Sequence, residues 1–178
     1  MTERIILYLE QTKADYLKET AGLTEEQWRF KPAPECWSVA ECAEHLAVVE
    51  DMLLGRIQKM KDEPAAAAEE LEKIKGKEDL ILKRVPVRGE RKAVAPERVR
   101  PANRWPSPEL LIAHFAESRD RTIAYARMAG DDDLRTRTFP HFAFGPLDGF
   151  QWLVFMAAHT ERHLKQLNEV KADPAFPR

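Results

Sequence analysis

Glycine is scarce in this chain, and its glycines and prolines cluster between long segments instead of recurring at the short intervals of strands and turns. Only 7 of the 178 residues are glycine, against 12 prolines. Sheet-rich folds need frequent turns, whereas the segments between these clusters have helical spacing. The sequence therefore predicts an all-α fold. Its length suits one compact domain, residues 1–178.

Disulfide frameworks, membrane spans and a strong charge of one sign are also missing. The two cysteines, Cys36 and Cys42, are too few and too close for a disulfide framework, and Cys42 is expected to be a small buried thiol. No run approaches the roughly 18 apolar residues of a membrane span, and the start lacks a signal-peptide core. We therefore expect a cytoplasmic protein with no membrane partner. The net charge of −2 gives no reason to expect nucleic-acid binding.

Helical periodicity predicts four main helices, at about residues 2–20, 38–61, 107–128 and 147–170. The second has the clearest start, because Ser38 and Glu41 have the spacing of a capping box. Ser107 followed by Pro108 is a typical beginning for the third. We interpret the four as a four-helix bundle.

The weakest helical signal lies between the second and third predicted helices. Residues 64–84 are compatible with short helices, while residues 85–106 are basic, rich in proline and expected to run extended over the surface. The bundle should therefore have one long crossover between helices two and three. Residues 23–38 and 130–149 are expected to be connectors.

The last predicted helix carries two histidines four residues apart, in the sequence HTERH at residues 159–163. Both fall on one stripe at steps of three and four: Trp152, Met156, His159, His163, Gln166 and Val170. Residues four apart on a helix are neighbours, so two imidazoles can reach one metal ion. The same pair could equally be polar core residues that only form hydrogen bonds.

A third ligand is available from the second predicted helix, where His45 lies at helical spacing between Cys42 and Val49. Three histidine ligands leave a coordination position open, which is typical of catalytic metal sites. A metal there would lower the pKa of a bound water or thiol and supply a nucleophile at neutral pH. The sequence alone does not identify a catalytic side chain.

The three histidines lie in two longer stretches, CWSVAECAEHLAVVE at residues 36–50 and HFAFGPLDGFQWLVFMAAHTERHLKQL at residues 141–167. Together these stretches resemble the DinB/YfiT-like superfamily of metal-dependent enzymes. The resemblance implies the same bundle topology and a metal-binding triad of His45, His159 and His163. Phe142 stands where the family has a proline after its loop histidine, which leaves the role of His141 open.

The resemblance also implies a function and partners. Members are metal-dependent hydrolases or thiol S-transferases, which implies a small-molecule substrate such as a low-molecular-weight bacterial thiol, and a homodimer. The implied cofactor is a divalent metal, Ni²⁺, Zn²⁺ or Fe²⁺, and three imidazoles do not select among these. The alternative is a non-catalytic, stress-associated helical binding protein that retains the fold.

Other residues have weaker signals. We interpret His114 as a hydrogen-bonded core histidine, with a fourth ligand or a substrate contact as the alternatives. Glu161 should point away from the stripe, unlike the glutamate of the HExxH zinc-protease pattern. We expect Arg162 to pair with a carboxylate, Gln166 to orient the imidazole of His163, and Trp37 to pack the end of the bundle.

Overall fold

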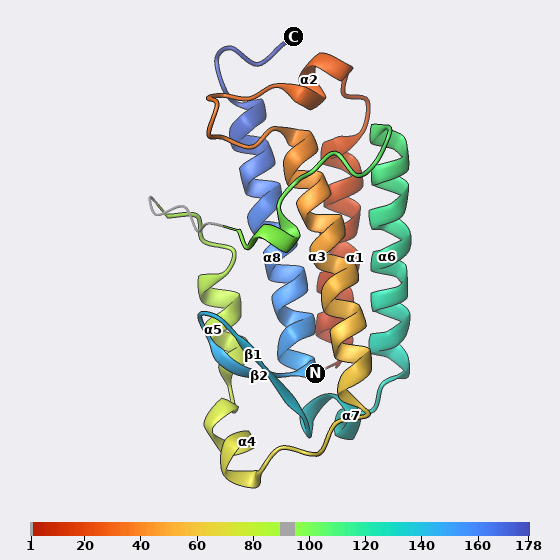
Figure 1. Ribbon diagram of the computed structural model, residues 1–178, viewed down its shortest axis with the longest axis vertical. Helices are drawn as coiled ribbons and strands as arrows, with labels where there is room; N and C mark the ends of the chain where they lie inside the picture. Colours follow the sequence, from red (N-terminus) through yellow and green to blue (C-terminus); the bar gives the residue numbers. More distant parts are fainter. Residues whose placement is uncertain (1, 90–94) are drawn as a thin grey trace.

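Four long helices lie side by side in the computed structural model, which describes residues 2–89 and 95–178 (Figure 1). They are α1 (Thr2–Thr20), α3 (Val39–Met60), α6 (Pro108–Met128) and α8 (Gly149–Lys171). Helices α1 and α3 each pack against both α6 and α8. This confirms the predicted four-helix bundle. None of the helices in the described ranges has an apolar stretch long enough to cross a membrane.

Helices α3 and α6 run in the same direction, so the chain must return along the length of the bundle between them (Figure 1). This long crossover, as predicted, contains the short helices α4 (Ala68–Ile74) and α5 (Lys77–Arg84), and then the 3-10 turn η1 (Glu97–Val99). Helix α5 packs on α8. Part of the expected surface excursion, residues 90–94, lies outside the described residues. Its later part is not confined to the surface, because Val99 is buried in the core.

Both predicted connectors contain regular structure that the sequence analysis missed. The first includes α2 (Glu25–Arg29). The second contains α7 (Asp131–Arg135) and an antiparallel hairpin of β1 (Thr138–His141) and β2 (Gly145–Asp148). These elements are only four or five residues long, too short to show a full hydrophobic period.

The helix starts follow from their capping residues. The Ser38 hydroxyl accepts the Glu41 N–H at 3.1 Å, and the Glu41 carboxylate accepts the Ser38 N–H at 2.8 Å, as predicted for α3. Helix α8 starts at Gly149, two residues later than predicted, because Asp148 caps it by accepting the Gln151 N–H at 2.7 Å. The preceding residue, Leu147, belongs to strand β2.

One buried arginine connects all four long helices. Arg119 on α6 is 0% exposed and forms a two-bond ion pair with Glu50 on α3, at 2.7 and 2.8 Å. It also donates to the Thr12 hydroxyl on α1 at 2.9 Å and to the Thr160 hydroxyl on α8 at 2.7 Å. Because a buried charge is tolerated only when its hydrogen bonds are satisfied, this network fixes how the helices meet.

Candidate metal centre

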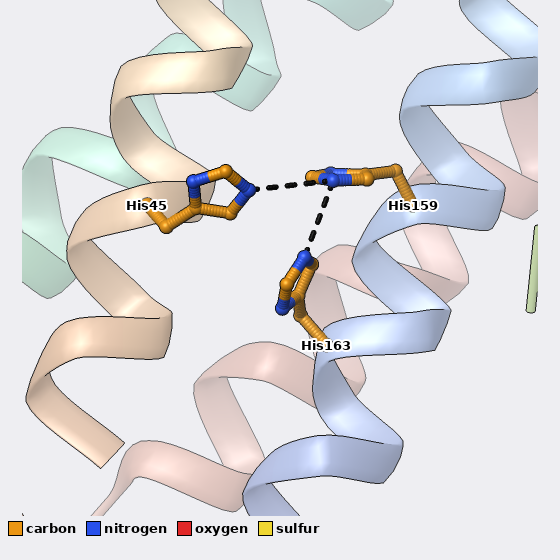
Figure 2. A group of neighbouring side chains, drawn as sticks. All are labelled: His45, His159 and His163. Atoms are coloured by element: carbon orange, nitrogen blue, oxygen red, sulfur yellow. Dashed lines mark hydrogen bonds between the residues drawn. The ribbon is translucent and has the colours of Figure 1, made fainter. Parts of the chain in front are cut away.

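Three histidine side chains converge between α3 and α8 (Figure 2). The Nε2 atom of His159 lies 3.4 Å from Nε2 of His45 and 3.2 Å from Nε2 of His163. All three ligand atoms lie within 4.8 Å of one another. Two nitrogens bound about 2.0 to 2.1 Å from a tetrahedral zinc ion would be separated by about 3.4 Å. The structure thus brings together the three histidines that the sequence singled out, at a spacing that fits one ion.

The orientation of His45 is fixed by the long crossover. Its Nδ1 donates a hydrogen bond to the backbone carbonyl of Val99 at 2.7 Å. A carbonyl only accepts, so the ring proton resides on Nδ1 and the lone pair of Nε2 faces the other two histidines. Burial lowers the pKa of His45, which favours this neutral form.

The two histidines of α8 are also held neutral. Burial, followed by the charges of the neighbouring imidazoles, lowers the pKa of His159 well below its ordinary value. The pKa of His163 is lowered in the same way, with burial again the largest cause, followed by His45 and then Arg162. Neutral imidazoles are the form that binds metal ions. The donor set therefore fits a divalent cation.

Trp37 belongs to this centre, although its position in the sequence suggested only packing at the bundle end. Its ring is stacked on His163 at 6.0 Å between centroids and lies 5.0 Å from the ring of His45. His45 and His163 are 4% and 7% exposed, whereas His159 is only partly buried. His159 is therefore the member of the cluster with the greatest solvent exposure.

A fourth histidine lies close by but outside the cluster. His141 ends strand β1, and its Nδ1 accepts the backbone N–H groups of Ala143 at 3.0 Å and Phe144 at 3.3 Å, which leaves the proton on Nε2. The ring of Phe155 packs on His141 at 4.7 Å and stacks on His159 at 5.3 Å. Burial lowers the pKa of His141 to about 4. The hairpin, which sequence analysis missed, positions it there.

The sequence matches the family model of the DinB superfamily over residues 8–167. The chain belongs to the DinB superfamily. It is 28% identical to the uncharacterised protein YuaE of Bacillus subtilis over 163 residues, which are 90% of this chain and 93% of YuaE.

A solved structure shows the same fold. The chain resembles YfiT from Bacillus subtilis with a TM-score of 0.68 and 16% sequence identity, over 99% of this chain and 89% of YfiT. YfiT is described as a probable metal-dependent hydrolase with an unusual four-helix bundle topology.

In this DinB-superfamily chain, the side chains of His114 and Glu161 form their hydrogen bonds with residues outside the histidine cluster. His114 lies outside the histidine cluster, where its Nε2 is 2.6 Å from a carboxylate oxygen of Asp51 and its ring packs on Trp105. It is hydrogen-bonded as expected, but half-buried and not a core residue. Glu161 accepts a hydrogen bond from the hydroxyl of Tyr8 on α1 and pairs with Lys165 at 2.6 Å.

The expected contacts of Arg162 and Gln166 differ in the structure. Arg162 donates to the backbone carbonyl of Val87, and none of the carboxylates among residues 2–89 and 95–178 forms an ion pair with it. The amide oxygen of Gln166 accepts from Arg88 at 3.0 Å. The polar side chain of Gln166 raises the pKa of His163, against the larger lowering by burial, yet the buried Nδ1 of His163 has no hydrogen-bond partner within standard geometry among the described residues.

Proposed function

We propose that His45, His159 and His163 hold a divalent metal ion and that this protein is a metal-dependent enzyme. The observation that carries the proposal is the convergence of three Nε2 atoms at 3.2 and 3.4 Å on the buried side of α8. A lone pair on each of these Nε2 atoms would repel its neighbours unless a cation, or a proton in an N–H···N hydrogen bond, lies between them. Three protein ligands on a tetrahedral ion also leave one position for water or substrate.

The chain supplies the surroundings for such chemistry. A divalent ion at such a centre lowers the pKa of a bound water or thiol, so that a nucleophile is present near neutral pH. The Val99 carbonyl holds the ring of His45, and Trp37 covers His45 and His163. The partly exposed side of His159 is where a small substrate would approach. Glu161 is engaged with Tyr8 and Lys165, which argues against it as the base.

Metal binding is tested first. Protein purified without an affinity tag is analysed for bound metal, and Ni²⁺, Zn²⁺ and Fe²⁺ are titrated into the chelator-treated wild type, His159→Ala and His114→Ala. We expect the wild type and His114→Ala to bind alike, because His114 lies outside the cluster, and His159→Ala to bind far more weakly. Equal affinity of His159→Ala and the wild type would refute the metal site.

Two reaction classes follow for the loaded protein: hydrolysis with water as the nucleophile, or transfer of a low-molecular-weight bacterial thiol to an electrophile. The description of YfiT supports the first, and the motifs shared with thiol S-transferases support the second. Assays of ester and amide cleavage without thiol, and of chlorinated electrophile consumption with thiol, separate them. Metal binding without turnover in either assay would favour a binding protein instead.

The predicted homodimer remains a proposal that rests on the family resemblance. Light scattering coupled to gel filtration measures the mass directly. A mass near twice the 20.5 kDa of one chain would support it, and a mass near 20.5 kDa would refute it.

A further inference from the structure

Glu44 is a buried carboxylate that holds the chain segment next to the metal centre. Its side chain is 5% exposed. Its two oxygens accept the backbone N–H groups of Ala102 and Asn103, both at 2.8 Å, and the guanidinium of Arg104 at 2.5 Å. The Arg104 N–H lies at 3.4 Å from the same carboxylate. None of these contacts reaches a histidine, and the site described above gives Glu44 no role.

The segment that Glu44 holds has little regular structure of its own. Its described part before α6 contains the 3-10 turn η1 and no strand. The N–H groups of Val99 and Arg100 bond to backbone carbonyls within this turn, whereas those of Ala102 and Asn103, beyond the turn, bond to a side chain. Asn103 adopts a left-handed conformation with φ +56°, which turns its N–H and that of Ala102 to the carboxylate. A well-satisfied buried carboxylate is therefore the main anchor of residues 102–104.

The same segment carries the carbonyl that orients His45. Val99 accepts from His45 Nδ1 at 2.7 Å, three residues before Ala102. Two contacts within the segment link both ends: Arg100 Nε donates to the Ala95 carbonyl at 2.9 Å, and Arg104 donates to the Arg100 carbonyl at 2.8 Å. Two consecutive residues of helix α3, Glu44 and His45, thus form hydrogen bonds with one connected segment, residues 99–104.

We propose that Glu44 is a positioning residue for the metal centre, because it anchors residues 102–104 and thereby holds the Val99 carbonyl that keeps the Nε2 lone pair of His45 directed to His159. This inference rests on the proposed function. Without the Val99 carbonyl, the proton of a neutral imidazole is free to occupy Nε2, which removes the lone pair that would bind the ion. Loss of such an outer contact typically weakens metal binding about 10- to 100-fold.

The test compares Glu44→Gln with Glu41→Gln. Glu41 is a matched control on the same helix, since its carboxylate also accepts a backbone N–H, from Ser38 at 2.8 Å, and pairs with a cation, Lys31 at 3.0 Å. Zn²⁺ affinity is measured by competition with a chromophoric chelator, and the tautomer of His45 by long-range ¹H–¹⁵N correlation in metal-free protein.

We expect Glu44→Gln to bind Zn²⁺ at least about tenfold more weakly and to show a mixture of His45 tautomers, while Glu41→Gln matches the wild type. If Glu44→Gln keeps both the affinity and the Nδ1–H tautomer, the inference is wrong and the proposed function stands. If the wild type binds no Zn²⁺, the proposed function fails, and the tautomer alone decides whether Glu44 positions His45.

A second measurement needs no variant at this position. If the segment favours metal binding, metal binding must stabilise the segment to the same degree. Hydrogen exchange of the Ala102, Asn103 and Arg104 amides in the wild type should therefore slow when Zn²⁺ is added, by more than exchange at the end of α6. Unchanged exchange at these three amides would overturn the proposal even if Glu44→Gln does not fold.

Discussion

At the scale of the residue, the buried ion pair of Arg119 and Glu50 is a place where a single substitution should greatly lower the free energy of unfolding. Arg119→Ala leaves the carboxylate of Glu50 buried without its partner, and breaking such a pair costs about 3 to 5 kcal/mol. Arg127→Ala removes an exposed pair with Glu10 and should cost less than about 1 kcal/mol. Urea unfolding of both variants measures the difference. Similar losses for both would show that the buried network contributes little.

The buried ring of His141 should make the stability of the metal-free protein depend on pH. Burial lowers its pKa to about 4 in the folded state, below the value of about 6.5 expected when unfolded. Between these values the unfolded chain binds more protons, so the free energy of unfolding decreases as the pH falls from about 6.5 to 4. His45, His159 and His163, whose pKa values are also lowered, contribute with the same sign.

The measurement is urea unfolding at several pH values for wild type and His141→Gln, both treated with chelator. Between about pH 4 and 6.5 we expect the free energy of unfolding to depend less steeply on pH in the variant, by the amount that corresponds to about one proton fewer taken up on unfolding. Identical slopes would mean that His141 is not buried as a neutral ring.

The three clustered histidines were found from sequence because helical spacing relates residues 159 and 163, and because His45 falls on the buried face of its own helix. Trp37 and Val99 were not found as parts of the site. Trp37 precedes the capping residue of α3, and Val99 acts through its carbonyl, which carries no signature in the amino-acid type. Contacts of this kind depend on how distant segments meet.

At the scale of the element, two glycines in helices should respond to alanine in opposite ways. A Cβ at Gly149, the first residue of α8, would lie 3.1 Å from the Leu134 carbonyl oxygen and 3.2 Å from a Leu134 methyl group in α7. A Cβ at Gly55 in α3 would meet nothing within 4 Å. The junction of α7 with α8 is therefore tightly packed, whereas the surface of α3 at Gly55 is open.

Gly149→Ala should lower the free energy of unfolding by about 1 to 3 kcal/mol through overpacking. Gly55→Ala should raise it by about 0.5 to 1 kcal/mol, since alanine favours the helix. Thermal unfolding monitored by circular dichroism measures both. A stabilising Gly149→Ala would show that α7 moves aside without cost.

The long helices could be predicted and the short elements could not. Each long helix has about twenty residues, enough for several hydrophobic periods, and three of the four have a side-chain cap at the start. By contrast, α7 and the hairpin are stabilised by contacts with α8, such as the stacking of Phe139 on Trp152 at 4.2 Å. Local sequence does not contain that information.

At the scale of the whole molecule, a bound metal should stabilise the fold. An ion that binds only the folded state, at 100 times its Kd, adds about 2.7 kcal/mol. For a chain of this size we expect a rise in Tm of roughly 5 to 10 °C with Zn²⁺, reversed by chelator.

Differential scanning calorimetry with and without Zn²⁺ makes this measurement. His159→Ala should show no rise, and His114→Ala should show the full rise of the wild type, because it removes an imidazole that lies outside the cluster. A rise that persists in His159→Ala would place the ion elsewhere.

The sequence distance within the histidine cluster has a consequence for biosynthesis. His45 and His159 are 114 residues apart, and α8, which supplies two of the three histidines, is the last helix of the chain. A nascent chain that has completed α1, α3 and α6 still lacks the pair on α8. Capture of an ion by all three histidines would therefore follow the docking of α8 against α3, and a protein that held such an ion would be one whose bundle has already closed.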